Sequence, residues 1–165
     1  MNTALMFSSA TDEWETPQAF FDALDVEFGF AIDIAATAEN AKCAAYFGRN
    51  GLEDDGLTAG FRRALRAVED GTGRRACWCN PPYSRGLQAK FIEKVARERF
   101  LGHTTVMLLP ARADTKAFHT HIYDAKTWQP RDGVEIRLLP GRLKFGGATN
   151  SAPFPSMVVI FRGDR

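Results

Sequence analysis

The sequence predicts an α/β fold: a mostly parallel, doubly wound sheet with helices on both faces and an antiparallel strand at one edge. Short apolar runs alternate with segments of helical periodicity as far as residue 125. Two more apolar runs follow with no helix between them, as in an antiparallel pair. A length of 165 residues, 45% of them hydrophobic, fits one compact domain. We expect a flexible amino-terminal arm over 1–13 and a single domain over 14–165.

The expected helices are segments whose apolar residues recur every three or four positions. They span 17–27, 38–46, 61–69, 86–100 and 114–122. The expected strands are short runs rich in apolar residues, and the run 30–35, apolar except for one carboxylate, is typical of a strand buried on both faces of a parallel sheet. They span 30–35, 76–79, 105–109, 134–139 and 157–161, with a Gly- and Pro-containing loop over 140–156. Doubly wound sheets bind ligands at the carboxyl ends of their strands, where Asp33, Asn80 and Pro110 fall.

The first helix has a recognisable start. We expect the Thr16 hydroxyl to cap it and Pro17 to occupy its first helical position. Phe20 and Leu24 then share an apolar face, and Gly29 ends the helix.

The most specific motif is Asn80-Pro81-Pro82-Tyr83, which directly follows the expected strand 76–79. It suits an exocyclic amine whose lone pair is delocalised into a ring, such as N6 of adenine. The Asn80 amide oxygen can accept one amine hydrogen, and the Pro81 carbonyl, held by the fixed φ of proline, can accept the other. Tyr83 offers a flat face for a base extruded from a duplex. The alternative is a proline-rich turn in which Asn80 merely caps a local carbonyl.

The sequence resembles the small phage-type DNA N6-adenine methyltransferases, relatives of the Dam enzymes among the class I S-adenosyl-L-methionine-dependent methyltransferases. The resemblance covers roughly residues 12–162. It rests on six motifs: Asp12-Glu13-Trp14-Glu15-Thr16-Pro17, Asp33-Ile34-Ala35-Ala36, Asn40-Ala41-Lys42-Cys43, Asp55-Gly56-Leu57, Cys79-Asn80-Pro81-Pro82-Tyr83-Ser84 and Ala152-Pro153-Phe154-Pro155-Ser156. It implies a Rossmann-like class I methyltransferase sheet and S-adenosyl-L-methionine as cofactor.

The resemblance also implies cofactor contacts. Thr16 and Pro17 correspond to the motif that meets the methionine carboxylate, although a plain helix cap is the alternative. Asp33 corresponds to the acidic residue that pairs with the methionine ammonium, with a structural Arg or Lys partner as the alternative. Ala35 lies where most class I enzymes have a Gly-x-Gly loop. Asp55 corresponds to the acidic residue beside the adenosine, and a solvated acidic turn is the alternative there.

Double-stranded DNA is the expected partner. With a net charge of +1, DNA must be held by a local basic face. The candidate loops lie within 111–133 and 140–156, with aromatic residues interleaved. Their basic candidates are Arg112, Lys116, Arg142 and Lys144. The alternative for each is an ordinary solvated side chain.

We therefore expect an enzyme that methylates N6 of a flipped adenine in DNA, encoded by a bacteriophage or prophage. The alternatives are a methyltransferase of RNA adenine or protein glutamine amides, and an inactive nucleic-acid-binding module. Cys77 and Cys79 flank one residue of a strand and point to the same face, which favours reduced thiols, and no metal site is expected. No apolar run approaches the roughly 20 residues of a membrane span, so we expect a cytoplasmic protein with no membrane partner.

Overall fold

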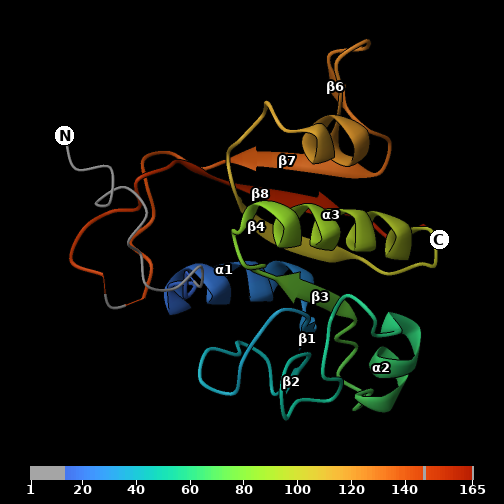
Figure 1. Cartoon of the computed structure of the whole chain (residues 1–165). Coiled ribbons are helices and arrows are strands. Elements are labelled where there is room, and N and C mark those ends of the chain that lie inside the picture. Colours follow the sequence, from blue (N-terminus) through green and yellow to red (C-terminus); the bar gives the residue numbers. More distant parts are fainter. Residues whose placement is uncertain (1–13, 147, 165) are drawn as a thin grey trace.

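The computed structural model describes residues 14–146 and 148–164 and contains a six-stranded sheet. The strands are β1 (Phe30–Asp33), β2 (Ala45–Tyr46), β3 (Ala76–Cys79), β4 (Thr105–Pro110), β7 (Val134–Leu138) and β8 (Ser156–Phe161). Their order is β2-β1-β3-β4-β8-β7, which can be followed from bottom to top in Figure 1. The first four strands run parallel, and β8 is antiparallel to both β4 and β7. This mixed α/β sheet, with an antiparallel pair at one edge, is compatible with a Rossmann-like fold.

Helices cover both faces of the sheet. They are α1 (Gln18–Phe28), α2 (Phe61–Ala67), α3 (Arg85–Arg99) and the π-helix η2 (Phe118–Ile122). The buried residues of α2, α3 and η2 pack on one face, and those of α1 pack on the other together with residues of 139–145 and 152–154. A small hairpin of β5 (Tyr123–Asp124) and β6 (Gln129–Pro130), which the sequence did not predict, projects beyond β7 (Figure 1).

The sheet core follows the alternation of side chains along each strand. In β3, Cys77 and Cys79 belong to the core beneath α2 and α3, whereas Trp78 belongs to the core beneath α1. All three side chains are fully buried. The prediction that both thiols of β3 point to one face is confirmed.

The predicted cap of the first helix is wrong. Helix α1 begins at Gln18, its cap position is Pro17, and no side chain caps it. The Pro17 carbonyl accepts hydrogen bonds from the N–H groups of Phe20 and Phe21. Thr16 is buried and uses its hydroxyl in a contact with Asn80 instead.

The predicted helix over 38–46 is also wrong. A single turn, closed by the bond from the Ala41 N–H to the Thr37 carbonyl, is all that forms there. The next N–H, that of Lys42, donates to the Asp33 carboxylate at 3.0 Å instead of to a carbonyl one turn earlier. The chain then extends into β2, which pairs in parallel with β1. A long-range hydrogen bond therefore overrides local helix propensity.

In the described part of the chain, no helix combines the length and apolar character needed to cross a membrane.

Candidate active site

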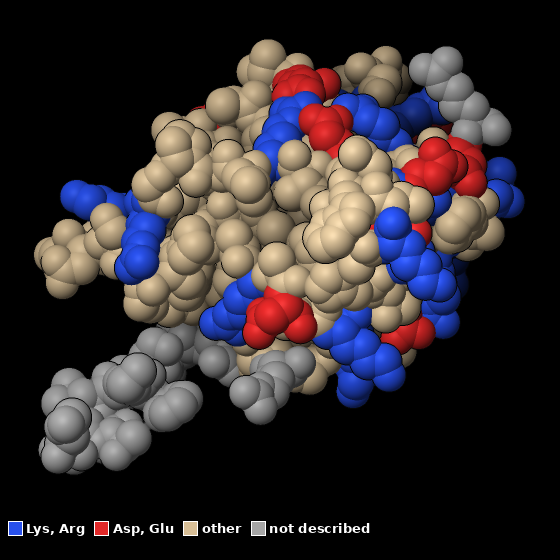
Figure 2. Space-filling model, turned by 90° about the horizontal axis from the view of Figure 1, so that it is seen from above, with Lys and Arg blue, Asp and Glu red and all other residues tan. Residues whose placement is uncertain are grey.

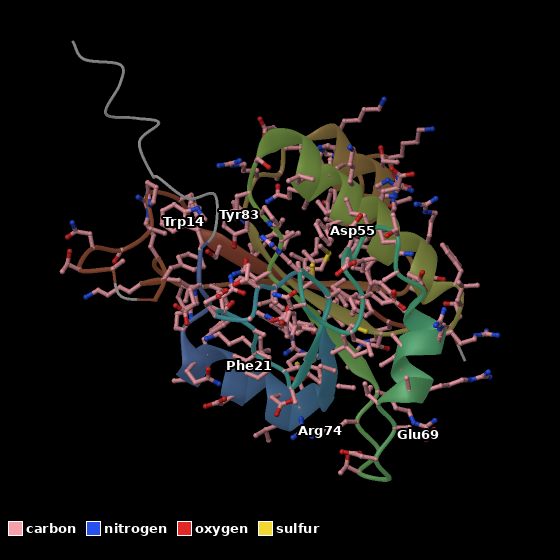
Figure 3. All side chains as sticks on the ribbon, turned by 60° about the horizontal axis from the view of Figure 1, so that its bottom comes forward. Trp14, Phe21, Asp55, Glu69, Arg74 and Tyr83 are labelled. Atoms are coloured by element: carbon pink, nitrogen blue, oxygen red, sulfur yellow. The ribbon has the colours of Figure 1, made fainter. Side chains whose placement is uncertain are left out.

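A cleft lies at the carboxyl ends of β1 and β3 and is walled by the loops that follow them, by the loop 47–56 and by the segment 14–16. The lining includes these predicted site residues: Thr16, Asp33, Ala35, Asp55, Asn80, Pro81 and Pro82. Pro17 and Tyr83 are not among the lining residues. Figure 3 shows Trp14 and Tyr83 near one another, and Asp55 on the other side of the site, on the loop 47–56. The structure thus gathers most of the predicted cofactor and catalytic residues in one cleft.

The side-chain amide of Asn80 has a defined orientation. Its Nδ2 donates to the Trp14 carbonyl and, at 3.0 Å, to the Thr16 hydroxyl. Its Oδ1 is buried and has no hydrogen-bond partner within the described ranges. A buried acceptor without a partner costs about 1–3 kcal/mol, so such atoms are rare and call for a ligand or water. Asn80 is therefore not a local cap: it lines the cleft, and its amide oxygen has no partner among the described residues.

Asp33 supplies a buried carboxylate at the end of β1. It is 3% exposed, and it accepts hydrogen bonds from the N–H groups of Lys42 (3.0 Å) and Ala35 (3.3 Å). No Arg or Lys side chain of the described residues forms an ion pair with it; the Lys42 ammonium pairs with Glu15 at 3.2 Å. Burial raises the pKa of Asp33 to about 6, against the lowering effect of its two backbone hydrogen bonds. A cationic group in the cleft would relieve this desolvation cost.

Glycines let two loops meet beside the cleft. A Cβ on Gly48 would lie 1.8 Å from the Ala36 carbonyl oxygen, and one on Gly56 would lie 2.0 Å from that of Ile34. The backbone between β1 and β2 therefore packs directly against the loop 47–56. The chain has no Gly-x-Gly after Asp33, and the glycines that permit close backbone approach belong to the facing loop instead.

Tyr83 does not line the cleft and is packed in the core on the α1 side of the sheet. It is 7% exposed, and its hydroxyl is 3.4 Å from the Leu108 carbonyl, to which it donates. The rings of Phe145 and Phe154 pack edge-on against it at 6.3 and 5.5 Å. In this conformation the face of Tyr83 is covered, so its predicted stacking role requires these two rings to move.

The four predicted DNA-binding residues are exposed, and none forms an ion pair within the described ranges. The Arg112 guanidinium lies over the Phe154 ring at 5.9 Å, next to the aromatic cluster that covers Tyr83. Basic and acidic side chains interleave on the face at the β7 end of the molecule (Figure 2). That face therefore shows no broad patch of one charge, and the basic residues of the loops remain the candidates.

The cysteines are free thiols, and Cys77 and Cys79 are buried. Burial raises the pKa of Cys77 to about 12, so this thiol stays protonated at neutral pH. Across the residues that the structure describes, no three His, Cys, Asp or Glu side chains come together as a possible metal site.

Comparison with known proteins decides the family. A family model described as DNA N-6-adenine-methyltransferase (Dam) matches residues 4–164. The chain belongs to the Dam family. It is also 34% identical over 73 residues to the Escherichia coli (strain K12) protein named "Putative methyltransferase YfdM", an alignment that covers 44% of this chain and 71% of that protein. The family and the relative both indicate a methyltransferase.

Two residues that contribute to the site of this Dam-family protein were not predicted from the sequence. Trp14 provides the carbonyl that accepts from Asn80, and its backbone role has no signature in the sequence. Lys42 provides an N–H to Asp33 and an ammonium to Glu15. The Asn40-Ala41-Lys42-Cys43 motif could have pointed to Lys42. Because local propensity favours a helix at 38–46, the sequence did not predict the extended loop that brings Lys42 to Asp33.

Proposed function

We propose that this protein is a DNA adenine N6-methyltransferase that takes its methyl group from S-adenosyl-L-methionine. The observation that carries the proposal is the buried, unpartnered Oδ1 of Asn80, which shares a cleft with the buried carboxylate of Asp33. One group is suited to accept a hydrogen from an amine, and the other is suited to bind an ammonium. A methyltransferase of amines needs both, because it must hold a cationic amino-acid cofactor beside the amine that it methylates.

The cleft fits the amino-acid and nucleoside parts of the cofactor. Asp33 would bind the methionine ammonium, and the Thr16 hydroxyl, which accepts from Asn80, still has its own hydrogen to donate to the carboxylate. Pro17 follows at the start of α1 and would contribute backbone contacts. Ala35 lines the cleft after β1, and Asp55, exposed on the facing loop, would bind the adenosine. When bound, S-adenosyl-L-methionine supplies an electrophilic methyl group.

The turn after β3 would hold the target amine. Asn80 Oδ1 accepts one N6 hydrogen and the Pro81 carbonyl accepts the other, so the nitrogen lone pair is directed out of the plane of the ring. The two acceptors are fixed before the substrate binds, and therefore little reorganisation is needed during methyl transfer. An Asn side chain is no general base, so the extra proton leaves the amine after transfer. Pro82 keeps the turn rigid between its neighbours.

The adenine must leave the duplex to reach this turn, because N6 is paired and stacked inside B-DNA. Arg112, Lys116, Arg142 and Lys144 are free to contact phosphates along the two candidate loops. Tyr83 would stack on the extruded base once the rings of the loop 143–154 move away. The target sequence would be read by these loops.

The experiment is transfer of labelled methyl groups from S-adenosyl-L-methionine to unmethylated duplex DNA, RNA and bulk protein. The proposal predicts N6-methyladenine in the DNA and its loss in Asn80→Ala. Gln129→Ala, which removes an exposed amide from the β5–β6 hairpin, is the matched control and should retain activity. Label in RNA alone or in protein glutamine alone would assign a different substrate. Cofactor binding that is absent in wild type would leave only the inactive nucleic-acid-binding module.

A further inference from the structure

The orientation of the Asn80 amide depends on two residues far from it in the sequence. The amide nitrogen has two hydrogens, and each has an acceptor in the segment 14–16: the Trp14 carbonyl and the Thr16 hydroxyl. If the amide were flipped, Oδ1 would face the Trp14 carbonyl, which has no hydrogen to donate. Flipping would thus bring two acceptors together and leave the amide nitrogen in the cleft. This geometry selects the orientation in which Oδ1 is free.

Tertiary contacts hold the segment 14–16 in place, some with the loop around Phe145 and Phe154 and one with Lys42. The Trp14 ring packs edge-on against Phe145 and Phe154, with centroids 5.4 and 5.2 Å apart. The Glu15 carbonyl accepts from the Gly146 N–H at 2.8 Å, and its carboxylate pairs with Lys42 at 3.2 Å. Aromatic pairs of this kind contribute about 0.5–1.5 kcal/mol beyond their buried area. The acceptors for Asn80 are therefore held by tertiary contacts.

Among the described residues, Asn80 is the hydrogen-bond partner of the Thr16 hydroxyl. Thr16 is 3% exposed, and it does not cap α1. Its hydroxyl lies 3.0 Å from Asn80 Nδ2, which is ordinary hydrogen-bond geometry. A buried hydroxyl is costly without a partner, so its placement against Asn80 is a specific feature of the fold.

We propose that Thr16, together with the Trp14 carbonyl, is a positioning residue that fixes the Asn80 amide so that Oδ1 faces the target amine. The inference rests on the proposed function for its catalytic consequence, but the orientation itself is a property of the protein without ligands. Thr16 acts through Asn80 and not on the amine. Losing its acceptor frees one amide hydrogen and lets the side chain rotate out of the reactive orientation, which lowers the rate of methyl transfer even when the cofactor is saturating.

The first test does not require activity. In wild type, both side-chain N–H signals of Asn80, assigned by their loss in Asn80→Ala, should exchange with solvent at least tenfold more slowly than those of the exposed Asn150. Thr16→Val, which has nearly the same shape but no acceptor, should speed the exchange of one hydrogen, and Thr16→Ser should restore the protection. Exchange of the wild-type Asn80 amide as fast as that of Asn150 overturns the proposal, whether or not the enzyme methylates DNA.

The second test separates positioning from cofactor binding. With S-adenosyl-L-methionine at a concentration that saturates each protein, Thr16→Val should methylate DNA in a single turnover at least tenfold more slowly than wild type, whatever the loss of its hydroxyl does to cofactor affinity. Thr16→Ser should come within about threefold of the wild-type rate. A Thr16→Val rate equal to wild type contradicts positioning, and so does a large loss of cofactor affinity with a normal rate at saturation. If wild type itself transfers no methyl group to DNA, the proposed function fails and the exchange measurement still decides the orientation.

Discussion

Asp33→Asn should make the cofactor-free protein more stable at pH 8 while removing its ability to bind S-adenosyl-L-methionine. The Asp33 carboxylate is 3% exposed and has two backbone hydrogen bonds but no cationic side chain as partner in the described ranges. Burial raises its pKa from 3.8 to about 6 because the charged form loses its hydration. Its ionised state thus opposes folding, and a bound cation would offset the desolvation cost that its two backbone hydrogen bonds leave uncompensated.

The size of the effect follows from the pKa. A rise from 3.8 to about 6 is about two pH units, and at 1.36 kcal/mol per pH unit it corresponds to about 3 kcal/mol. The folded protein binds the proton more tightly than the unfolded chain, so the contribution of Asp33 to stability falls as pH rises from about 4 to about 6. An Asn side chain, like a protonated Asp, has one acceptor oxygen and one donor group. The variant should therefore gain up to about 3 kcal/mol at pH 8 and almost nothing near pH 4.

Urea unfolding of wild type and Asp33→Asn across this pH range measures the difference directly. Asp70→Asn is the control: hydrogen bonds from Thr72 lower the pKa of this exposed carboxylate, so its removal should give no gain at pH 8. Saturating cofactor should raise the Tm of wild type and leave that of Asp33→Asn unchanged. An Asp33→Asn protein that is no more stable than wild type at pH 8, or that gains the same stability from the cofactor, refutes the reasoning.

Three further predictions concern the cleft and the DNA loops. Asn80→Asp sets a carboxylate oxygen against a backbone carbonyl, so the single-turnover methylation rate should fall about 100-fold; an unchanged rate contradicts the amide orientation. Gly56→Ala, whose Cβ meets a carbonyl oxygen at 2.0 Å, should lower the free energy of unfolding in urea by about 1–3 kcal/mol, whereas Gly60→Ala, with open space around it, should not. Arg142→Ala and Lys144→Ala should each reduce the slope of log K for DNA against log[salt] by about 0.9, and an unchanged slope excludes a phosphate contact.

The sequence was sufficient to predict the central strands and the convergence of the two key side chains. The runs 76–79 and 157–161 are apolar throughout, and 105–109 is apolar after Thr105, as expected of strands covered on both faces; they form β3, β4 and β8. Asp33 and Asn80 end neighbouring parallel strands, and such ends meet at one edge of the sheet. Their shared cleft follows from that topology alone.

Features that depend on contacts between distant residues could not be predicted. Local propensity favoured a helix at 38–46, but the Asp33 carboxylate takes the Lys42 N–H from nine residues away. Thr16 has the pattern of a helix cap, yet its hydroxyl meets Asn80, 64 residues further along the chain. Tyr83 was expected to be open to a base, and rings from the 140–156 loop cover it. In each case a tertiary partner, invisible in the local pattern, decides the outcome.

In the proposed mechanism, Asp33 and Asn80 face one bound cofactor and one amine in the same cleft. A crystal structure with S-adenosyl-L-methionine would show whether they do. We predict the methionine ammonium within hydrogen-bond distance of the Asp33 carboxylate and the reactive methyl group directed toward Asn80 Oδ1. A cofactor bound outside this cleft, or bound with its ammonium turned away from Asp33, would contradict the account.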